Sequence, residues 1–535
     1  MNKLPFFQKG SPGDFSFRER TGPSNYGKAL VFFGLLIFLF SVLSLRLFQL
    51  TIVKGDYYRR LSESNRIRQL LIEPRRGTIV DRKGLVLAEN SPADTKKNGE
   101  RLFSRRTYHS PTATGAILGY RQLADEHDLA ADNCLPKLHL GDKTGKKGVE
   151  KLFECDLRGV PGKKLIEVDA RGQYLRTLTV QPPNDGQTLT LALDLELQQK
   201  AAELVRGQRA AIVVLKPQTG EVLALVSTPA FNPQDFEDNN ALPIAAYLTQ
   251  ADQPLFNRTL EGVYPPGSIF KLIVGTAALE EKKIDEHTLF EDTGTIKAGP
   301  LSFGNWYFLQ YGKTDGQVDI VKGIRRSNDI FFYKTAETVG PDKIKIWAEN
   351  FGFGKKTGSG LAEADGLIPS PFWKKETLKE DWYLGDTYNY SIGQGYVLVT
   401  PIQIAQATAA LGNGGRLCRP QLLKIANDNA HCEKINLHPT TLSLVREGMR
   451  QACSAGGTGW PLFDFQVKGQ PIQTACKTGT AESRDKSTAP HAWFTAFAPF
   501  ENPEIVVTVL VEEAGQGSDI GGPIVKEILK EYFER

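Results

Sequence analysis

The chain has 535 residues, of which 41% are hydrophobic and 24% charged, which is enough for two or three domains with substantial cores. Its formal net charge is only +4. This balance argues against a nucleic-acid-binding protein, which normally carries a strongly basic domain or stripe, so no nucleic-acid partner is expected.

The N-terminal region contains a long apolar segment. Residues 29–45 carry no charge, lie between Lys28 and Arg46, and are followed by further apolar sequence as far as Val53. Such a run is long enough to cross a bilayer core. A cleaved signal peptide and a buried core helix are the alternatives, but the apolar stretch is too long for a signal peptide and 28 mostly polar residues precede it. We therefore predict a retained transmembrane helix at residues 29–50.

Charge on the two sides of this helix predicts its orientation. Residues 1–28 contain the basic residues Lys3, Lys9, Arg18, Arg20 and Lys28, and only the acids Asp14 and Glu19. Positive segments stay in the cytoplasm, so residues 1–28 are predicted to form a cytoplasmic tail and the rest of the chain to lie outside the inner (plasma) membrane. Arg46 and the pair at residues 59–60 weaken this asymmetry.

The cysteines and histidines give no metal pattern. The six cysteines, at positions 134, 155, 418, 432, 453 and 476, show no C-x-x-C spacing, and an exported domain permits disulfides without the sequence saying which cysteines pair. The seven histidines form no H-E-x-x-H motif. No metal site and no cofactor are predicted.

The sequence of residues 51–185 predicts a mainly extended pedestal. Residues 75–90 resemble two short strands around a turn at 81–84, residues 91–114 are too polar for a core, and residues 146–178 mix a short helix, a glycine-proline turn and strand-like runs. A cluster of turn residues at 181–187 marks the expected boundary.

Residues 186–535 are predicted to form a larger α/β (α+β) domain. Two apolar strands at 210–227 are joined by a hairpin signal at 217–220, and two more strands at 491–500 and 504–514 precede a closing helix. Thr400, Pro401 and Gln403 are typical of a capped helix start. Strands and helices do not alternate strictly, which favours an antiparallel sheet with helices on its faces.

Three short motifs in this domain point to chemistry. Ser268 precedes Lys271 by three residues, the triad Ser327-Asn328-Asp329 opens a helix, and Lys477-Thr478-Gly479-Thr480 ends a strand. Each motif is weak alone, since serine is common near helix starts and lysine on exposed helix faces. Together, in this order, they are the S-x-x-K, serine-triad and K-T-G trio of serine acyl-transfer enzymes that react with penicillin.

With these motifs, the chain resembles the class B penicillin-binding proteins, and within them the elongation-type penicillin-binding protein 2 family. The resemblance also rests on "RRGTIVDRKGLVLAEN", "GLIPSPFWK" and "YSIGQGYVLVTPIQIAQATAALGNGG", and on an acid at position 329, where division-type relatives usually have asparagine. It implies the penicillin-binding transpeptidase fold and a peptidoglycan D,D-transpeptidase that acts in cell elongation and shape and is a β-lactam target. The alternatives are a division-type enzyme, a penicillin sensor or hydrolase, and a scaffold that only activates a glycosyltransferase.

Each residue type in the three motifs suits one step of an acyl transfer. A serine hydroxyl needs an adjacent base, and Lys271 follows Ser268 by one helical turn, within expected hydrogen-bond reach. Burial and the nearby cation Lys477 are expected to lower the pKa of Lys271 and make it usable as a base. Family resemblance implies that Ser327 passes the proton to the leaving D-Ala nitrogen.

The resemblance also implies how substrate is held. The backbone N–H groups of Ser268 and Thr480 would form the oxyanion site, and the hydroxyls of Thr478 and Thr480, on either side of Gly479, would hold the donor's terminal carboxylate. Asp329 would bind the substrate peptide or hold Lys271.

Two features depart from the family pattern. Some elongation-type relatives bind zinc through a cysteine and a histidine at the positions of Asn328 and Asp315, so no metal is expected there. The connection between Asn90 and Gly119 is short where longer relatives carry a lobe. The expected partners are peptidoglycan stem peptides, β-lactams and a membrane glycosyltransferase. Partner activation through that lobe is expected to be reduced or absent.

Two further features have open interpretations. The aromatic run at residues 303–311 either lines a glycan groove or covers the core, and the sequence does not separate these alternatives. His491 and Trp493, on the strand expected beside the K-T-G strand, are expected to pack rather than to catalyse.

Overall fold

The computed structural model describes residues 26–91, 104–169, 171–425, 430–483 and 487–535. Most of the expected tail at 1–28 and part of the connection between Asn90 and Gly119 therefore lie outside the described residues. The chain divides into two compact units, residues 1–70 with 163–181 and residues 71–162 with 182–535. The expected domain boundaries at 28, 50 and 185 stay predictions, and contacts group residues 71–162 with the C-terminal part of the chain.

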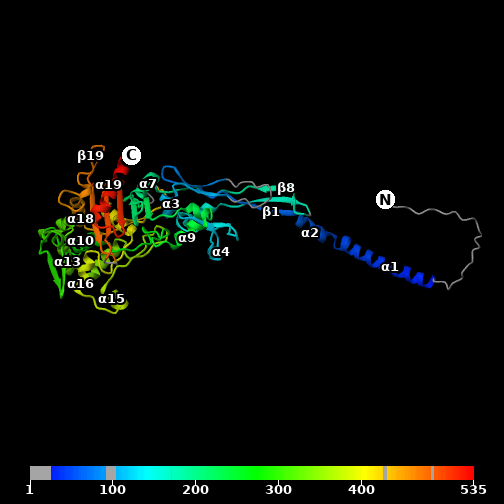
Figure 1. Cartoon of the computed structure of the whole chain (residues 1–535), viewed down its shortest axis with the longest axis horizontal. Coiled ribbons are helices and arrows are strands. Elements are labelled where there is room, and N and C mark those ends of the chain that lie inside the picture. Colours follow the sequence, from blue (N-terminus) through cyan, green and yellow to red (C-terminus); the bar gives the residue numbers. More distant parts are fainter. Residues whose placement is uncertain (1–25, 92–103, 170, 426–429, 484–486) are drawn as a thin grey trace, which may run out of the picture. The chain divides into compact units, whose positions relative to one another are not determined.

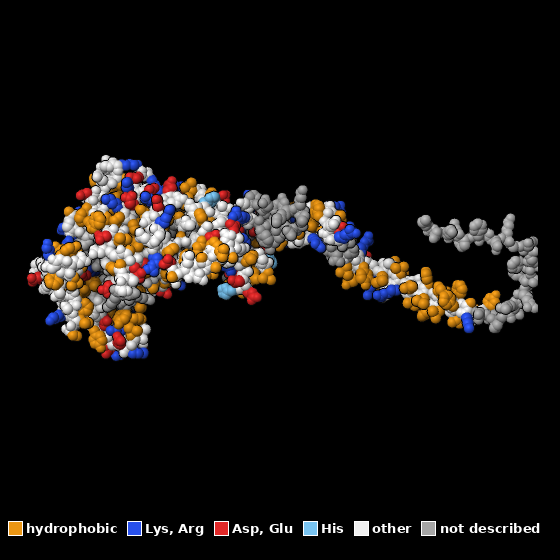
Figure 2. Space-filling model, in the orientation of Figure 1, with side chains coloured by type: hydrophobic (Ala, Val, Ile, Leu, Met, Phe, Trp, Pro, Cys, Tyr) orange, Lys and Arg blue, Asp and Glu red, His pale blue; other side chains and the backbone are white. Residues whose placement is uncertain are grey.

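The first unit begins with a long exposed helix. Helix α1 spans Tyr26–Phe48 and continues through a π-helical turn, Gln49–Val53, into α2, Gly55–Arg66. Residues 26–53 form one helix long and apolar enough to span a membrane, three residues longer at each end than predicted. None of the residues of α1 is buried, and Figure 2 shows hydrophobic side chains along its surface. An uncovered apolar helix of this length is consistent with a single-pass membrane anchor.

A three-stranded antiparallel sheet completes this unit. Its strand order is β1-β7-β8, with bounds Ile67–Ile72, Gly162–Val168 and Tyr174–Gln181. Strand β8 is exposed along most of its length.

The second unit starts with the small elements that precede the large sheet. A four-stranded sheet has the order β4-β3-β2-β9, with bounds Arg106–Tyr108, Val86–Asn90, Ile79–Val80 and Leu189–Thr190. Strands β2 and β3 confirm the predicted strand pair at 75–90. The other elements are α3 (Pro111–Leu118), β5 (Arg121–Leu123), α4 (Glu126–Ala131), β6 (Lys143–Gly145), α5 (Gly148–Leu152) and α6 (Glu154–Arg158).

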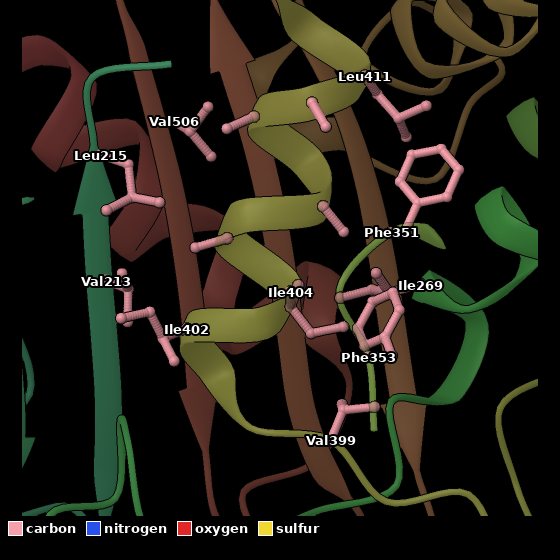
Figure 3. Packing of buried hydrophobic residues seen from close by; sticks show 14 of the residues in the cluster. Val213, Leu215, Ile269, Phe351, Phe353, Val399, Ile402, Ile404, Leu411 and Val506 are labelled. Carbon is pink, nitrogen blue, oxygen red and sulfur yellow. The ribbon is translucent and has the colours of Figure 1, made fainter. Parts of the chain in front are cut away.

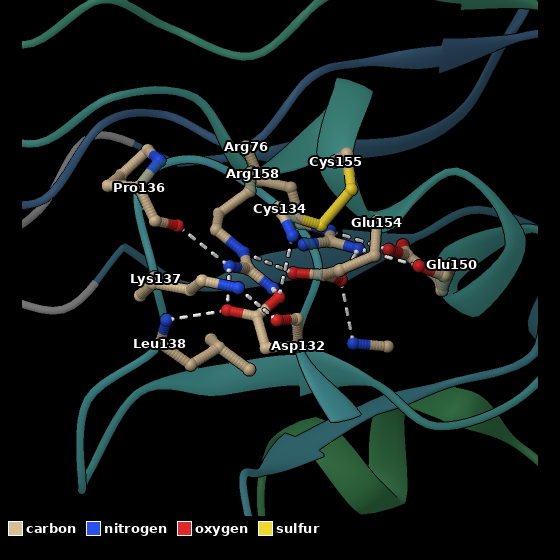
Figure 4. The surroundings of a disulfide bond; sticks show 11 residues. Arg76, Asp132, Cys134, Pro136, Lys137, Leu138, Glu150, Glu154, Cys155 and Arg158 are labelled. Atoms are coloured by element: carbon tan, nitrogen blue, oxygen red, sulfur yellow. Dashed lines mark hydrogen bonds and ion pairs between the residues drawn. A yellow bond between two sulfur atoms is a disulfide. The ribbon is translucent and has the colours of Figure 1, made fainter. Parts of the chain in front are cut away.

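A chain of charged side chains surrounds the disulfide Cys134–Cys155 in this part (Figure 4). Arg158 donates to both oxygens of Asp132, at 2.9 and 3.0 Å, and to Glu154 at 2.9 Å. Arg76 donates to the other oxygen of Glu154 at 2.7 Å. Because each carboxylate has a guanidinium partner, these charges are tolerated with little exposure to water.

The large sheet is antiparallel and five-stranded, with the order β11-β10-β22-β21-β20. The strands are β10 (Ala210–Leu215), β11 (Val222–Thr228), β20 (Ala475–Ala481), β21 (His491–Ala498) and β22 (Ile505–Val511). The predicted hairpin of β10 and β11 and the predicted neighbours β21 and β22 are confirmed. Figure 1 labels α7 and α19, two helices of this part of the chain.

Helices cover both faces of this sheet. Alternate residues of β10 fall into two separate apolar clusters, Val213 and Leu215 in one and Ile212 and Val214 in the other. The first cluster includes α17, Pro401–Gly412, which lies against the sheet in Figure 3. The second includes α7 (Leu195–Leu204) and α19 (Gly517–Phe533). Strands covered on both faces become continuously apolar, which explains the unbroken hydrophobic runs in the sequence.

The capping box predicted for α17 is present, since the Thr400 hydroxyl accepts from the Gln403 N–H and the Gln403 side chain accepts from the Thr400 N–H.

The remaining helices are α8 (Pro233–Glu237), α9 (Ala241–Thr249), α10 (Lys271–Glu280), α11 (Trp306–Tyr311), α12 (Ile320–Arg326), α13 (Asp329–Val339), α14 (Pro341–Asn350), α15 (Pro371–Leu378), α16 (Leu384–Ser391) and α18 (Pro439–Ala452). Short strands pair as β12 (Phe290–Asp292) with β15 (Gly316–Val318), β13 (Thr295–Ala298) with β14 (Leu301–Gly304), β16 (Arg416–Cys418) with β17 (Cys432–Lys434), and β18 (Gln466–Val467) with β19 (Gln470–Pro471).

The structure pairs all six cysteines, which the sequence left open. Besides Cys134–Cys155, the disulfides are Cys418–Cys432 and Cys453–Cys476.

Candidate active site

Ser268 lies on a tight elbow in front of a buried helix. It occupies a 3₁₀ turn, Gly267–Ile269, and α10 begins at Lys271. Gly267 has φ +54°, and a Cβ at this position would lie 2.8 Å from the carbonyl oxygen of Thr480. Only glycine combines this conformation with this close approach to β20, so the elbow sets Ser268 against the end of the K-T-G strand.

Lys271 is fully buried and faces the serine triad. Its Nζ donates to the Ser327 carbonyl at 2.8 Å, to the Ser327 hydroxyl at 3.3 Å and to Asp329 Oδ1 at 2.6 Å. Among the described residues, no hydrogen bond joins Ser268 Oγ to this ammonium. The hydrogen-bond partners of Lys271 are Ser327 and Asp329 instead, and its expected reach to Ser268 stays a prediction.

Ser327 is placed by two helices that meet at it. It ends α12 with φ +52°, and Asn328 caps the start of α13 by accepting from the Phe331 N–H. A non-glycine residue in the left-handed region costs about 1–2 kcal/mol, and such conformations gather at functional sites. The triad Ser327-Asn328-Asp329 lies at the start of α13, as predicted.

Lys477 approaches Ser327 from the other side. It lies on β20, is fully buried, and its Nζ donates to Ser327 Oγ at 2.8 Å and to the Thr478 carbonyl at 3.0 Å. The Ser327 hydroxyl therefore lies between two lysine nitrogens. This arrangement joins all three sequence motifs in one place.

The two lysines have different surroundings. Burial lowers the pKa of Lys271 below its ordinary value, and the carboxylate of Asp329 opposes this shift. Burial lowers the pKa of Lys477 well below its ordinary value, the charge of Lys271 lowers it further, and Asp329 opposes both effects. The two lysine nitrogens flank the Ser327 hydroxyl, and each of two neighbouring cations disfavours the charged form of the other.

Asp329 holds Lys271, which was one of its two expected roles. Its Oδ1 accepts from Lys271, and its Oδ2 accepts from the Trp306 N–H at 2.8 Å. Its own N–H donates to Asn305 Oδ1 at 3.1 Å. Both carboxylate oxygens thus have hydrogen-bond donors.

A cleft of about 870 Å³ runs along these groups. Its lining includes Ser268, Ser327, Asp329, Thr478 and Thr480. Other lining residues are Trp306, Gln310, Tyr311, Ile392, Gln394, Gly457, Thr458, Trp460, Glu482, Ser483, Thr488, Pro490, Gln516, Ser518 and Asp519. The cleft is large enough for a peptide and brings it against the Ser268 hydroxyl.

Asn328 belongs to a polar cluster beneath the cleft. Its amide donates to Asp292 Oδ2 at 2.8 Å and to Asp315 Oδ2 at 3.1 Å, and Arg326 donates to Asp315 Oδ1 at 2.9 Å. Asp292 also accepts from the Asn305 amide at 2.8 Å. The carboxylate oxygens face N–H donors and Arg326 pairs with Asp315, so the cluster offers neither the cysteine nor the histidine of the zinc-binding relatives.

Some aromatic residues of the run at 303–311 line the cleft, and others cover the core. Trp306 and Tyr311 line the cleft, whereas Phe303 packs against Tyr333 and Tyr388. Trp493 is fully buried on β21 and donates from its indole to the Pro265 carbonyl, which fits the predicted packing role.

Several residues of the site had no signal in the sequence. Asp292, Asn305 and Thr458 come from distant segments, and no motif marks them. The disulfide Cys453–Cys476 fixes the residue directly before Lys477. The adjacency of Cys476 to the K-T-G motif is the one sequence signal that could have drawn attention to it.

Comparisons with known proteins agree with this geometry. The family described as "Penicillin binding protein transpeptidase domain" matches residues 210–530. The chain belongs to the penicillin-binding protein transpeptidase family. A second family, "Penicillin-binding Protein dimerisation domain", matches residues 101–191.

The relatives extend over nearly the whole chain. The peptidoglycan D,D-transpeptidase MrdA of Haemophilus influenzae is 31% identical over 100% of this chain and 96% of its own length. The Escherichia coli K12 protein of the same name is 30% identical over 96% of this chain and 95% of its own length. These penicillin-binding relatives confirm the expected serine acyl-transfer enzyme and favour the elongation type over the division type.

Solved structures confirm the expected fold. PBP2 of Pseudomonas aeruginosa matches with a TM-score of 0.74 and 33% identity, over 87% of this chain and 96% of that one. PBP2 of Helicobacter pylori, solved in a complex with MreC, matches with a TM-score of 0.75 and 29% identity, over 87% and 99%. The motif residues of this chain therefore lie on the penicillin-binding transpeptidase fold.

Proposed function

We propose that Ser268 is the nucleophile of a peptidoglycan D,D-transpeptidase that acts on stem peptides ending in D-Ala-D-Ala. Its hydroxyl attacks the carbonyl of the penultimate D-Ala, the bond to the terminal D-Ala breaks, and the donor peptide stays on Ser268 as an ester. The amine of a second stem peptide then attacks the ester and restores the serine. The observation that carries this proposal is the convergence of Ser268, Lys271, Ser327 and Lys477 on one cleft.

Lys271 takes the proton of Ser268 in this mechanism. Burial lowers the pKa of Lys271 and the pairing with Asp329 opposes this, and a protonated Lys271 must lose its proton before it can act as the base. Ser327 Oγ offers a route, since it lies 3.3 Å from Lys271 Nζ and 2.8 Å from Lys477 Nζ. Transfer through this hydroxyl leaves Lys271 neutral and Lys477 charged.

The leaving group receives its proton along the same route. Lys477 returns its proton through Ser327 to the nitrogen of the departing D-Ala, which needs it to leave as an amine. Ser268 loses one proton and the D-Ala nitrogen gains one. The two lysines together keep the same number of protons, so the step is balanced.

Backbone and hydroxyl groups hold the reacting peptide. The N–H groups of Ser268 and Thr480 stabilise the oxyanion, and Gly267 brings them together because the elbow packs directly on Thr480. Thr478 and Thr480, on the strand with Gly479, face the donor's terminal carboxylate. A β-lactam, which carries a similar carboxylate, acylates the same serine.

The N-terminal helix anchors this enzyme in the inner (plasma) membrane. Residues 26–53 supply a single apolar span, and the basic residues before it favour a cytoplasmic N-terminus with the catalytic part outside. A membrane glycosyltransferase supplies the nascent glycan. The complex described as a peptidoglycan synthase that coordinates polymerization and crosslinking, 28% identical to this chain with a TM-score of 0.75, supports this partner.

Labelling of the purified full-length protein with a fluorescent penicillin tests the proposal. The native protein should form a stable adduct, and Ser268→Ala should form none. Cross-linking of lipid-linked glycan in the presence of the partner polymerase should follow the same pattern. A folded native protein that takes no label would overturn the enzyme and support a scaffold, and an adduct released within minutes would support a hydrolase.

A further inference from the structure

Lys477 lies on a strand that is paired on one side only. Strand β20 is the last strand of the five-stranded sheet and pairs with β21, where Lys477 is opposite Thr495. Among the described residues, no strand pairs with the other edge of β20. One row of ladder hydrogen bonds holds an edge strand less firmly than two rows would. The contact of Lys477 Nζ with Ser327 Oγ, at 2.8 Å, therefore depends on further attachments of β20.

One such attachment is a disulfide directly beside Lys477. Cys476 precedes Lys477 on β20, is fully buried and is bonded to Cys453, which follows the last residue of α18. Successive side chains of a strand point to opposite faces. Cys476 packs in the apolar cluster that includes α7 and α19. The disulfide therefore holds β20 from the face opposite the Lys477 side chain.

Helix α18 also packs closely against α12, the helix that ends at Ser327. The two helices approach each other at Gly448, where an added Cβ would lie 2.7 Å from Ile324 Cβ. Ile324 lies about one helical turn before Ser327. A larger side chain at position 448 would separate the helices, so the glycine lets α18 lie directly against the end of α12.

The loop after α18 adds two hydrogen bonds to the same end of α12. Arg325 donates to the Ala455 carbonyl at 2.9 Å, and Arg326 donates to the Gly456 carbonyl at 3.2 Å. Both arginines belong to the last turn of α12. Helix α18 and its loop are thus joined to the residues that place Ser327.

These attachments form a closed frame around the contact between Ser327 and Lys477. Helix α12 carries Ser327 at its end, β20 carries Lys477, and α18 contacts the first and is bonded to the second. The contacts between α18 and α12 are several and non-covalent. Among the described residues, the disulfide is the one covalent cross-link within this frame. Its loss should loosen β20 more than the loss of any single hydrogen bond.

We propose that this disulfide holds Lys477 at hydrogen-bond distance from Ser327 Oγ and so supports proton transfer to the leaving nitrogen. The inference rests on the proposed transpeptidase function, in which these two residues pass that proton. Cys453 and Cys476 are positioning residues, because they act through Lys477 and neither is among the described residues that line the cleft. A proton passes between two groups only within about 2.6–3.2 Å, so a small displacement of β20 is enough to slow the transfer.

Two substrates with different leaving groups test this role in the full-length protein. In benzylpenicillin the leaving atom is a ring nitrogen that must gain a proton, whereas an acyl-D-Ala thioester releases a thiolate that can leave without one. The double variant Cys453→Ala, Cys476→Ala should slow acylation of Ser268 by penicillin at least about tenfold, since a positioned proton donor contributes about 10²–10⁴-fold. Acylation by the thioester should slow less, because it needs only the transfer away from Lys271.

A second disulfide gives the matched control. The double variant Cys418→Ala, Cys432→Ala removes the bond between β16 and β17, and neither cysteine adjoins a motif or is among the described residues that line the cleft. Both acylation rates should stay at the native values. Thermal unfolding of the two double variants compares their stability, so that a loss of folding is recognised as such.

Gly459→Ala disturbs the cross-link without removing it. Gly459 donates to the Ala452 carbonyl at 2.8 Å, and an added Cβ would lie 2.4 Å from Cys476 Sγ. The sulfur is bonded and cannot turn away, so the new methyl group should displace β20. This variant should show the same excess loss with penicillin, and it decides the test if the double variant of Cys453 and Cys476 does not fold.

The remaining outcomes separate the inference from the function beneath it. Equal losses with penicillin and the thioester would indicate a general disturbance of the cleft and overturn the inference, as would native rates with both. If the native protein is acylated by neither substrate, the proposed function fails and the inference falls with it.

Discussion

Lys271 Nζ lies 2.6 Å from Asp329 Oδ1, with the lysine fully buried and the carboxylate nearly so. This ion pair distinguishes Lys271 from Lys477, which has no carboxylate partner among its hydrogen bonds. The carboxylate opposes the effect of burial on the pKa of Lys271 and so favours its charged form. The acid of the Ser327-Asn328-Asp329 triad is thereby linked to the acylation step.

Asp329→Asn should shift the pH profile of acylation. The base must be neutral, so the rate rises with pH through its pKa and then levels off. Asp329 raises the pKa of Lys271, and its removal should move the acid limb to lower pH. The plateau should fall several-fold, since the amide cannot accept from both Lys271 and the Trp306 N–H. The check is the second-order rate constant with penicillin between pH 5 and 9, and an unmoved acid limb would refute a role for this pair.

Ser268→Ala and Lys271→Ala should both abolish acylation. Without the hydroxyl no ester forms, and without the amine the proton of Ser268 has no acceptor, so the rate should drop at least about 1,000-fold. Fluorescent penicillin labelling measures this loss. Thermal unfolding of each variant serves as the control for folding, and residual labelling of Ser268→Ala would place the nucleophile elsewhere.

Gly267→Ala should damage the site with a modest loss of stability. The new methyl group would lie 2.8 Å from the Thr480 carbonyl and push the elbow away from β20. We expect acylation to fall at least about tenfold, because the two oxyanion N–H groups no longer converge. Gly207→Ala is the matched control, since Gly207 has φ +79° with no atom within 4 Å of the added Cβ. Equal rates in the two variants would contradict the role of the elbow.

Glu150→Ala should strongly destabilise the second compact unit. Glu150 is fully buried and accepts from Arg76 at 2.6 Å and from Arg106 at 2.7 Å. Its removal leaves buried guanidinium charges without this partner and should lower the free energy of unfolding by about 3–5 kcal/mol. Asp381→Ala, which removes an exposed pair with Lys375, should cause no measurable change. Denaturant unfolding compares the two.

The same carboxylate predicts an acid sensitivity. Burial by itself would raise the pKa of Glu150, but Arg106, Arg76 and Arg121 lower it to about 2 from an ordinary value of 4.5. The stabilisation is therefore fully present above pH 4.5 and is lost as the pH falls toward 2. The native protein should lose stability over this interval by more than Glu150→Ala does.

Local signals were enough to predict many elements. The apolar run of the N-terminal helix, the hairpin turn at 217–220 and the caps of α17 act within a few residues, and each produced the expected element. The three motifs identified the four central residues of the site, because an acyl transfer needs a nucleophile, a base and a proton donor of specific types.

Only the tertiary structure decided how these residues are connected. Lys271 turns to Asp329, 58 positions away in the sequence, and Ser327 Oγ meets Lys477, 150 positions away. The cysteine pairs and the contact of Thr458 with Thr478 likewise join separate segments. Side-chain direction, burial and charge pairing depend on which distant segments pack together, and these determine the hydrogen-bond partners of each lysine and hydroxyl. The sequence determined which chemical groups are present, and packing determined their partners.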